Sequence, residues 1–276
     1  MYKRQGLYIQ RLGQHILIQY HAFIWKKFIP SIVETLKNRG FGDFYLEQMR
    51  IPGEQKKAPI SLKQGAPQEA IIEEFGIKLK LIFNQNHDIG IYTDMSSIRE
   101  DLFPFFKEGQ NFLNLFSYTG AFSLMALKEK MTVTSVDLSK RYMSWLEENI
   151  KINNFEISRH QSIVKACDKM LSTNKRKYEF ILCDPPSFSS NGKKRLSSFD
   201  FYKNNWQLLW DSLSPGGVLV AFLNTHGIPR KKFKKLIENK TKRGGKIIKE
   251  LHLSKDCSSL NSFPESDYLK GFIIQK

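Results

Sequence analysis

The run Asn111-Phe-Leu-Asn-Leu-Phe-Ser-Tyr-Thr-Gly-Ala-Phe-Ser123 decides the fold that we expect of this chain. Its first half predicts a short apolar strand over residues 112–116, and its second half is a small-residue turn around Gly120 that opens a helix. A second strand is predicted over 132–136, and it ends in Asp137. Strand, glycine turn, helix, strand and acid follow one another in this order in a doubly wound nucleoside-binding half.

The same run also limits the kinds of ligand that the site can bind. Gly120 lets the backbone approach a ligand closely, and Asp137 can accept hydrogen bonds from both hydroxyls of a ribose. Only one glycine stands in the turn, so the G-x-G-x-x-G fingerprint of dinucleotide sites is absent. A ligand with a nucleoside but no phosphates therefore fits better, and S-adenosylmethionine is such a ligand. For either feature alone, the alternative is a plain α/β turn with an incidental acid.

A second motif, Asp184-Pro-Pro-Ser-Phe188, follows the apolar run 178–183, which is typical of a buried strand. Prolines donate no backbone hydrogen bond and keep the turn stiff. A target amine could be held by the Asp184 carboxylate and the Pro185 carbonyl, with the Phe188 ring stacked on a base. Most strand-ending Asp-Pro pairs are plain turns. Its position two strands after the expected ribose acid favours methylation of a planar nitrogen compound, with these candidate catalytic residues: Asp184, Pro185, Pro186 and Phe188.

Taken together, three segments resemble the class I S-adenosylmethionine-dependent methyltransferases: residues 111–123, residues 135–139 with 145–149, and residues 184–188. Within this class the chain is similar to the bacterial methyltransferases of large-subunit ribosomal RNA, of the RlmI and RlmK type. The similarity covers about residues 70–276. It implies an α/β, Rossmann-like fold with a mostly parallel seven-stranded sheet, an antiparallel edge strand and a small N-terminal α+β segment.

The resemblance implies S-adenosylmethionine as the cofactor. It places Asp137 on the ribose, Leu138 against the adenine and Asp184 at the edge of the cofactor site. The loop beside the methionine moiety would comprise Phe116, Ser117, Tyr118, Thr119, Gly120 and Ala121. The family also places an acid after the third strand for the adenine amino group. Here the acid is displaced to Asp168, so the alternative is that Cys167 faces the ring and Asp168 caps a helix.

The charge of the chain favours a polyanionic partner. The formal net charge is +16, from 43 Lys and Arg against 27 Asp and Glu. Residues 230–250 alone carry ten Lys or Arg against two Glu, and their spacing predicts a helix over 230–242 with one basic face. A lysine-rich, solvated surface is the alternative. With ribosomal RNA as the expected partner, the candidate contacts are Arg99, Asn224, Arg230, Lys231 and Lys234.

The loop after the expected fifth strand favours methylation of a base nitrogen by direct in-line transfer. Some relatives carry a cysteine nucleophile in this loop, but residues 221–227 contain none, and Cys183 is expected to be a core thiol inside its strand. His226 is either a base or a neutral loop histidine. Two other functions stay open: methylation of a protein amide or a small molecule, and RNA binding by a relative without activity.

The chain divides by composition into three expected parts: a small basic accessory domain (1–65), a hairpin region beside the cofactor mouth (66–100) and the catalytic domain (101–276). The hairpin is expected to pair residues 78–83 with 89–92. The aromatic residues of 16–29 are expected in a core, and residues 51–68 are typical of a linker.

Other features bear on compartment and partners. No run of eighteen apolar residues and no apolar N-terminal signal region occur, so a cytoplasmic protein without membrane contact is expected. The three cysteines lack metal-site spacing, which favours a reducing compartment and no metal. The sequence allows a monomer or a homodimer.

Overall fold

The computed structural model describes residues 6–49, 61–62, 68–83, 89–190, 195–225, 227–242, 244–254, 257 and 267–276. Within these ranges, only the backbone is described for 61–62, 188–190 and 195–196. The chain forms two compact units, Met1–Thr93 and Asp94–Lys276. The expected linker over 51–68 lies almost entirely outside the described residues.

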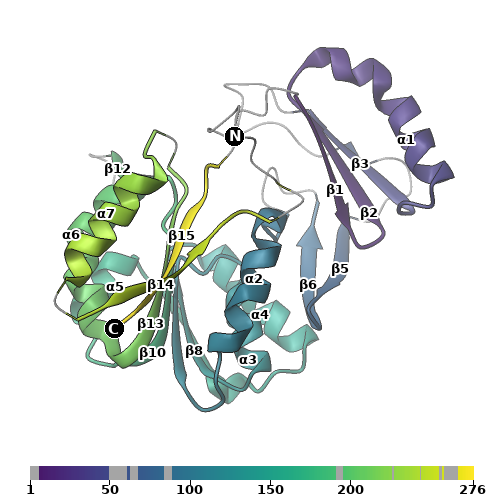
Figure 1. The fold of residues 1–276 in the computed structure, drawn as a ribbon. Coiled ribbons are helices and arrows are strands. Elements are labelled where there is room, and N and C mark those ends of the chain that lie inside the picture. Colours follow the sequence, from purple (N-terminus) through teal and green to yellow (C-terminus); the bar gives the residue numbers. More distant parts are fainter. Residues whose placement is uncertain are drawn as a thin grey trace. The chain divides into compact units, whose positions relative to one another are not determined.

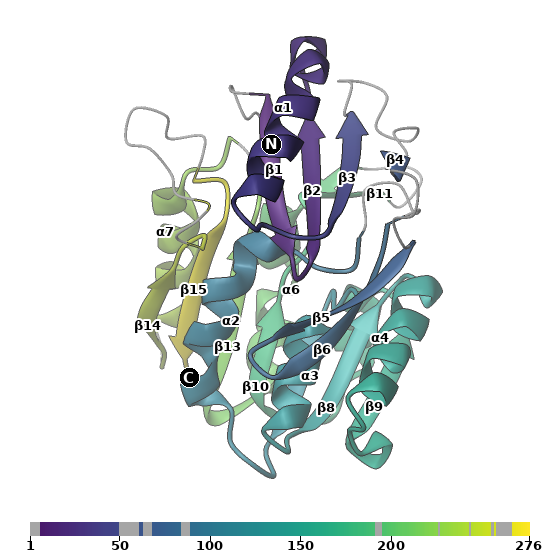
Figure 2. The same ribbon diagram turned by 90° about the vertical axis from the view of Figure 1, so that its right-hand side faces the viewer.

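The first unit contains a four-stranded sheet in the order β1-β2-β3-β4. Helix α1 lies along this sheet (Figure 2) and contributes Ile29 and Val33 to a core that also holds Ile16, Ile18 and Tyr45. Burial of this apolar face stabilises the unit. The elements are β1 (Leu7–Leu12), β2 (His15–Tyr20), η1 (Phe23–Phe28), α1 (Ile29–Asn38), β3 (Phe44–Met49) and β4 (Ser61–Leu62).

Only part of the aromatic stretch in this unit enters the core. Tyr20 ends β2 and is 2% exposed, as expected, and its hydroxyl donates to Glu47 Oε1 at 2.6 Å. Beyond β2 the chain continues as the short helix η1, which has no buried residue. The expectation that Phe23 and Phe28 are core residues is therefore wrong: their side chains are 66% and 44% exposed.

The hairpin pairs differently from the expectation. Strand β6 (Ile77–Ile82) pairs antiparallel with β5 (Glu69–Glu74), whereas residues 89–92 form no strand. Phe75 and Gly76 connect the two strands with φ of 51° and 72°. Positive φ at both central residues is the geometry that two-residue hairpins favour. Phenylalanine at the first turn position is not typical of such a turn. The sequence therefore did not predict that β6 pairs with the preceding strand β5 rather than with residues 89–92.

The second unit contains a seven-stranded sheet in the order β14-β15-β13-β10-β7-β8-β9. The register is parallel except at β15, which runs antiparallel to both β13 and β14 and so lies one strand in from the edge. This confirms the predicted fold class. The strands are β7 (Asn111–Leu115), β8 (Thr132–Asp137), β9 (His160–Val164), β10 (Tyr178–Cys183), β13 (Leu213–Leu223), β14 (Lys246–Leu251) and β15 (Lys270–Gln275).

Helices cover both faces of this sheet (Figure 1), with α5, α6 and α7 on one face and α2, α3 and α4 on the other. A core cluster beneath α5, α6 and α7 includes Met170, Trp206, Phe233 and Phe272. Covering both faces explains why the inner strands β10, β13 and β15 carry continuous apolar runs, at 180–183, 218–223 and 272–274, rather than alternating ones. The helices are α2 (Ser96–Leu102), α3 (Ala121–Lys128), α4 (Lys140–Ile152), α5 (Cys167–Thr173), α6 (Ser198–Ser212) and α7 (Arg230–Thr241).

Candidate active site

Five of the predicted site features lie at or just beyond the carboxyl ends of five adjacent parallel strands. In the order β9, β8, β7, β10, β13, these are Asp168, Asp137, the loop 116–121, Asp184 and Asn224. Ligands of open α/β sheets bind at this edge. Neighbouring strands are about 4.8 Å apart, so the strands that lead to Asp137 and Asp184, one on each side of β7, are separated by roughly 10 Å.

The loop after β7 has an unusual backbone. Phe116, Tyr118 and Gly120 all have positive φ, of 61°, 52° and 86°. Positive φ is uncommon for bulky non-glycine residues, and such strained positions cluster at ligand sites. Each ring makes an edge contact, Phe116 with Phe201 at 5.1 Å and Tyr118 with Tyr142 at 4.6 Å between centroids. These contacts hold the strained conformation in place.

Asp137 fixes the loop against the end of β8. Its Oδ2 accepts the Tyr118 backbone N–H at 3.0 Å, and its Oδ1 accepts the Ser139 backbone N–H at 2.9 Å. A carboxylate oxygen has two lone-pair sites, so each oxygen can also accept a ribose hydroxyl. The backbone hydrogen bonds orient both oxygens, which fits the ribose role that the sequence predicted.

Gly120 leaves room for helix α4 beside the loop. A Cβ at this position would lie 2.4 Å from Leu146 Cγ, so any larger residue would push against the helix. The buried Asn149 of the same helix donates through Nδ2 to the Thr119 carbonyl at 2.9 Å. Thr119 itself is 0% exposed. Helix α4 therefore packs against the loop and holds it through the Asn149–Thr119 hydrogen bond.

The remaining cofactor candidates differ in accessibility. Leu138 is 72% exposed, which leaves its apolar side chain free to contact a flat ring. Asp168 lies partly exposed in the first turn of α5, after the N-cap residue Ala166, which makes no side-chain capping bond. Cys167 is buried, and its Sγ lies 3.9 Å from the Val136 carbonyl. The thiol therefore faces the core, so the alternative in which Cys167 faces the adenine is not supported.

Asp184 holds the central unsatisfied polar atom of this site. Its Oδ1 is enclosed and has no hydrogen-bond partner among the described residues. Desolvation by burial, and to a smaller extent the nearby charge of Asp94, together raise the pKa of Asp184 to about 7. Buried polar groups are normally paired. An enclosed acceptor without a protein donor is suited to a donor on a ligand, such as an amine.

The turn that contains Asp184 is fastened to the loop after β13. Ser187 Oγ donates to Asn224 Oδ1 at 2.8 Å, so Asn224 lies beside the Asp-Pro-Pro turn as a support for it. Tyr202 of α6 donates to the carbonyls of Cys183 and Phe222 at 2.7 and 2.9 Å, which joins the ends of β10 and β13. Pro185 is buried and Pro186 is exposed. The side chain of Phe188 lies outside the described part of the chain, and so does His226.

Tyr268 is a site residue for which the sequence offered no role. Its hydroxyl donates to Asp94 Oδ2, and the backbone N–H of Ser254 donates to the Asp94 carbonyl at 2.9 Å. Ser254 also accepts from the Ser97 backbone N–H at 2.9 Å. Two residues of the β14–β15 connection are thus bound to Asp94, just before α2, and to Ser97 in its first turn, and the charge of Asp94 acts on Asp184. No local motif marks this contact, because it joins positions 174 residues apart.

The predicted RNA contacts are mostly engaged within the protein. Arg99 is 1% exposed, with its guanidinium carbon 6.0 Å from the Phe122 ring centroid, so it cannot reach RNA at the surface and that prediction is wrong. Arg230 pairs with Asp267 at 2.9 Å and donates to the carbonyls of Leu251 and Leu269. Its side chain therefore fastens β14 and β15, which opposes the predicted RNA contact.

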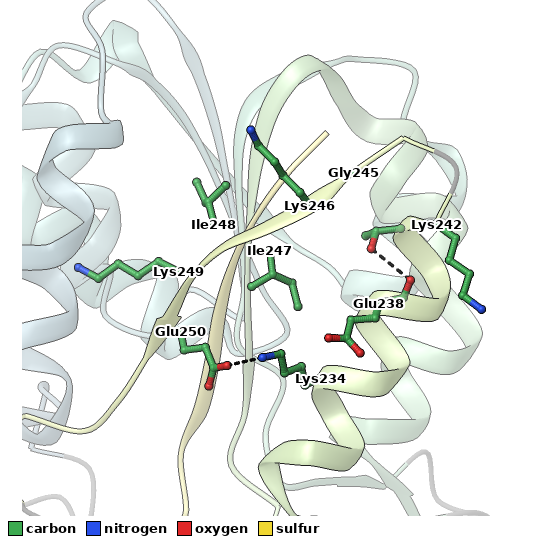
Figure 3. Close-up of a pocket in the computed structure, with 10 residues that line it drawn as sticks. Lys234, Glu238, Lys242, Gly245, Lys246, Ile247, Ile248, Lys249 and Glu250 are labelled. Carbon is green, nitrogen blue, oxygen red and sulfur yellow. Dashed lines mark hydrogen bonds and ion pairs between the residues drawn. The ribbon is translucent and has the colours of Figure 1, made fainter.

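The basic face of α7 is narrower than predicted. Lys234 pairs with Glu250 at 2.8 Å across a groove between α7 and β14 (Figure 3), and the ion pair raises the pKa of Lys234. The groove has a volume of about 540 Å³, and Lys249 extends from it to pair with Asp101. Lys231 is exposed at the start of the helix and stays a candidate. This groove lies along the sheet edge, whereas Asp137 and Asp184 follow interior strands.

Neither a metal site nor a membrane span occurs in the described part of the chain. No cluster of three or more His, Cys, Asp or Glu in the described ranges could hold a metal ion. Among the described helices, none has the length and apolar character needed to cross a membrane.

Comparison with known proteins places these features in a family. Residues 55–273 match the family model described as S-adenosylmethionine-dependent methyltransferase. YwbD of Bacillus subtilis is 32% identical over 213 residues, which is 75% of this chain and 54% of YwbD. The "Ribosomal RNA large subunit methyltransferase I" of Serratia proteamaculans is 30% identical over 231 residues, 79% of this chain and 58% of that protein. The chain thus spans a little over half the length of these curated relatives.

A solved structure agrees along nearly the whole chain. The crystal structure of SMU.776 complexed with SAH has a TM-score of 0.86 and 27% identity, and the match covers 98% of this chain and 72% of that one.

Proposed function

Because this chain belongs to the S-adenosylmethionine-dependent methyltransferase family, we propose that it transfers a methyl group to a base nitrogen in ribosomal RNA. The observation that carries this proposal is the enclosed Oδ1 of Asp184, an acceptor without a protein donor among the described residues, at the end of β10. An amine or ring N–H of a flat base would supply the missing hydrogen bond. The Pro185 carbonyl, in the same stiff turn, can accept a second N–H.

The residues around β7 and β8 fit S-adenosylmethionine. Asp137 would hold the ribose, since backbone N–H groups orient both of its oxygens. Leu138, 72% exposed, would cover one face of the adenine, and Asp168 would accept from its amino group. The strained loop 116–121 would lie beside the methionine moiety. S-adenosylmethionine supplies a methyl group that its sulfonium already activates, so the protein mainly aligns the acceptor and excludes water.

Asp184 would also handle the proton that the acceptor nitrogen loses. With a pKa of about 7, raised by desolvation and then by Asp94, the carboxylate is a stronger base than an ordinary aspartate. Ser187, Asn224 and Tyr202 keep this turn in place. Cys183 is 0% exposed, and burial raises the pKa of its thiol well above the usual range. A buried, protonated thiol opposes carbon methylation through a cysteine adduct.

Ribosomal RNA as the substrate is supported by two independent features. The relative from Serratia proteamaculans is named for large-subunit ribosomal RNA. The net charge of +16 favours a polyanion. In this proposal Asp94–Lys276 is the catalytic unit, Met1–Thr93 is an accessory unit, and the protein acts in the cytoplasm where ribosomes are assembled.

The test is transfer of tritium from labelled S-adenosylmethionine to ribosomal RNA from a strain that lacks this protein. We expect label in large-subunit RNA with the unaltered protein. Asp184→Asn, of the same size, should lose methyl transfer while its affinity for SAH, measured by calorimetry, stays within about twofold. Digestion to nucleosides then identifies the methylated atom.

Each other outcome has a definite meaning. Label on a carbon atom would contradict nitrogen methylation. Label in protein alone would move the acceptor from RNA to a side-chain amide. SAH binding without transfer to RNA, protein or small-molecule extracts would favour a relative that binds RNA without activity. Full turnover by Asp184→Asn would remove Asp184 from the mechanism.

A further inference from the structure

The helix η1 (Phe23–Phe28) in the first unit presents apolar side chains to solvent. None of its six residues is buried. The exposed fractions are 66% for Phe23, 56% for Ile24 and 44% for Phe28. A single exposed apolar residue is ordinary, but adjacent large ones mark an interaction site. The proposed methyl-transfer reaction assigns no role to this helix.

The helix is anchored so that its outer residues stay exposed. Trp25 packs against the core cluster of the unit, and a Cβ at Gly6 would lie 3.2 Å from its Nε1. The Trp25 and Phe28 rings make an edge contact with centroids 6.0 Å apart. Trp25 therefore packs toward the core of the unit, while the side chains of Phe23 and Phe28 stay exposed.

The same helix carries positive charge close to its rings. Lys26 Nζ lies 5.6 Å from the Phe23 ring centroid, and Lys27 Nζ lies 4.9 Å from the Phe28 centroid. No acid lies in η1. From residue 21 to residue 39 the only acid is Glu34, against Lys26, Lys27, Lys37 and Arg39. Flat rings and cations on one short helix complement a chain of bases joined by phosphates.

We propose that η1 is a stacking platform for unpaired bases of single-stranded RNA, with the Phe23 and Phe28 rings against bases and the Lys26 and Lys27 ammonium groups near the adjoining phosphates. The choice of RNA rests on the proposed function, but the platform is separate from the methyl-transfer site. Since every base has an apolar face, such a platform accepts many sequences. It would capture an unpaired segment of the substrate rather than select the methylated nucleotide.

The test measures the binding of a fluorescein-labelled oligouridylate by anisotropy, with the full chain. Phe23→Ala with Phe28→Ala should weaken binding about thirtyfold or more, because each of the two stacked bases contributes on the order of 1–3 kcal/mol. Phe23→Leu with Phe28→Leu keeps the apolar area but removes the rings, and should weaken binding by a similar factor. Phe41→Ala, at a 40% exposed phenylalanine of the same unit, is the matched control and should bind like the unaltered protein.

Salt dependence separates the roles of rings and lysines. Lys26→Gln with Lys27→Gln should reduce the slope of log affinity against log salt by about 0.7 for each phosphate that a lysine no longer neutralises. The ring variants should weaken binding and leave that slope unchanged. Duplex RNA of the same length should respond much less to the ring variants, because its bases are already stacked.

Three results would overturn the platform. The first is equal affinity of the ring variants and the unaltered protein for the single strand. The second is full binding by the leucine variants, which would mean apolar contact without stacking. The third is concentration-dependent dimerisation in sedimentation that the ring variants abolish, which would make η1 a surface for a second copy. Methyl-transfer assays distinguish failure of the platform from failure of the proposed function. If only the platform is wrong, the unaltered protein still methylates RNA; if the proposed function is wrong, it does not.

Discussion

Asp184 is less stable in its ionised form than an ordinary aspartate because burial desolvates its carboxyl group, whose Oδ1 is enclosed. Desolvation, followed by the charge of Asp94, raises its pKa from 3.8 to about 7. The folded protein therefore binds this proton more tightly than the unfolded chain does. The resulting stabilisation is fully present below pH 3.8 and is lost as the pH rises through about 7. The same burial gives the site its unpaired acceptor.

The direction of this pH dependence of stability can be tested with a single substitution at Asp184. Asp184→Asn has no carboxyl to ionise, so its free energy of unfolding should rise relative to that of the unaltered protein as the pH increases from 3.8 to 7. Urea titrations at matched pH measure the difference. Parallel curves for the two proteins over this range would mean that the Asp184 carboxyl is solvated.

Gly120 offers a second test at this scale. Gly120→Ala adds a Cβ 2.4 Å from Leu146 Cγ at a residue with φ of 86°. Gly109→Ala is the matched control, since its φ is 79° and no atom lies within 4 Å of its Cβ position. Both changes carry the cost of positive φ, about 1 kcal/mol. Overpacking should destabilise Gly120→Ala by roughly 1–3 kcal/mol more in urea unfolding. Equal losses would show that Leu146 moves aside freely.

In helix α7, the neighbouring strands decide which basic side chains form ion pairs and which stay exposed to solvent. The residue spacing in this segment predicted a helix with one basic face, and the opposite face is buried, with Phe233 and Ile237 both 0% exposed. Spacing alone cannot tell which lysines meet acids on another element. Arg230 and Lys234 pair with Asp267 and Glu250, which come from the segments around β14 and β15. The lysines of α7 that remain exposed, and could serve the proposed RNA contact, are Lys231, Lys232 and Lys235.

The test at this scale compares two groups of basic residues. Changing Lys231, Lys232 and Lys235 together to Gln should reduce the salt slope of RNA binding by roughly 0.7–0.9 for each phosphate left without a cation. Arg230→Gln should leave the slope unchanged and instead lower the free energy of unfolding, by about 1–3 kcal/mol, because Asp267 and two carbonyls lose their donors in a partly buried setting. An unchanged slope in the triple variant would make α7 a solvated face.

At the scale of the whole molecule, the division into Met1–Thr93 and Asp94–Lys276 predicts which part of the chain SAH stabilises. All of the proposed cofactor residues belong to the second unit. SAH at about a hundredfold excess over its Kd should stabilise that unit by about 2.7 kcal/mol.

Hydrogen exchange with mass spectrometry is the measurement for this prediction. Protection by SAH should increase at β7 and β8 and stay unchanged at β1, β2 and β3. The unliganded protein is the reference for each peptide. Equal gains across both units would mean that they unfold together, and gains confined to the first unit would contradict the site.

The sequence by itself determined the parallel sheet, the order of its motifs and the positions of Asp137 and Asp184. It could do so because buried strands and their turns leave local patterns: apolar runs, a glycine with positive φ, and prolines that stop a strand. Strand β10 begins and ends at the predicted residues, Tyr178–Cys183. These signals depend on neighbours in the chain, which the sequence displays directly.

Only the tertiary structure decided what the polar and aromatic side chains do. Arg99 is buried, although a surface cation was expected, and Phe23 is exposed, although a core ring was expected. Tyr268 binds Asp94, although the sequence indicated no role for it in the site. Burial and pairing depend on segments far along the chain, here 174 residues apart for Tyr268 and Asp94. A side chain's environment is set by the packing of whole elements, and the periodicity of a single element does not contain that information.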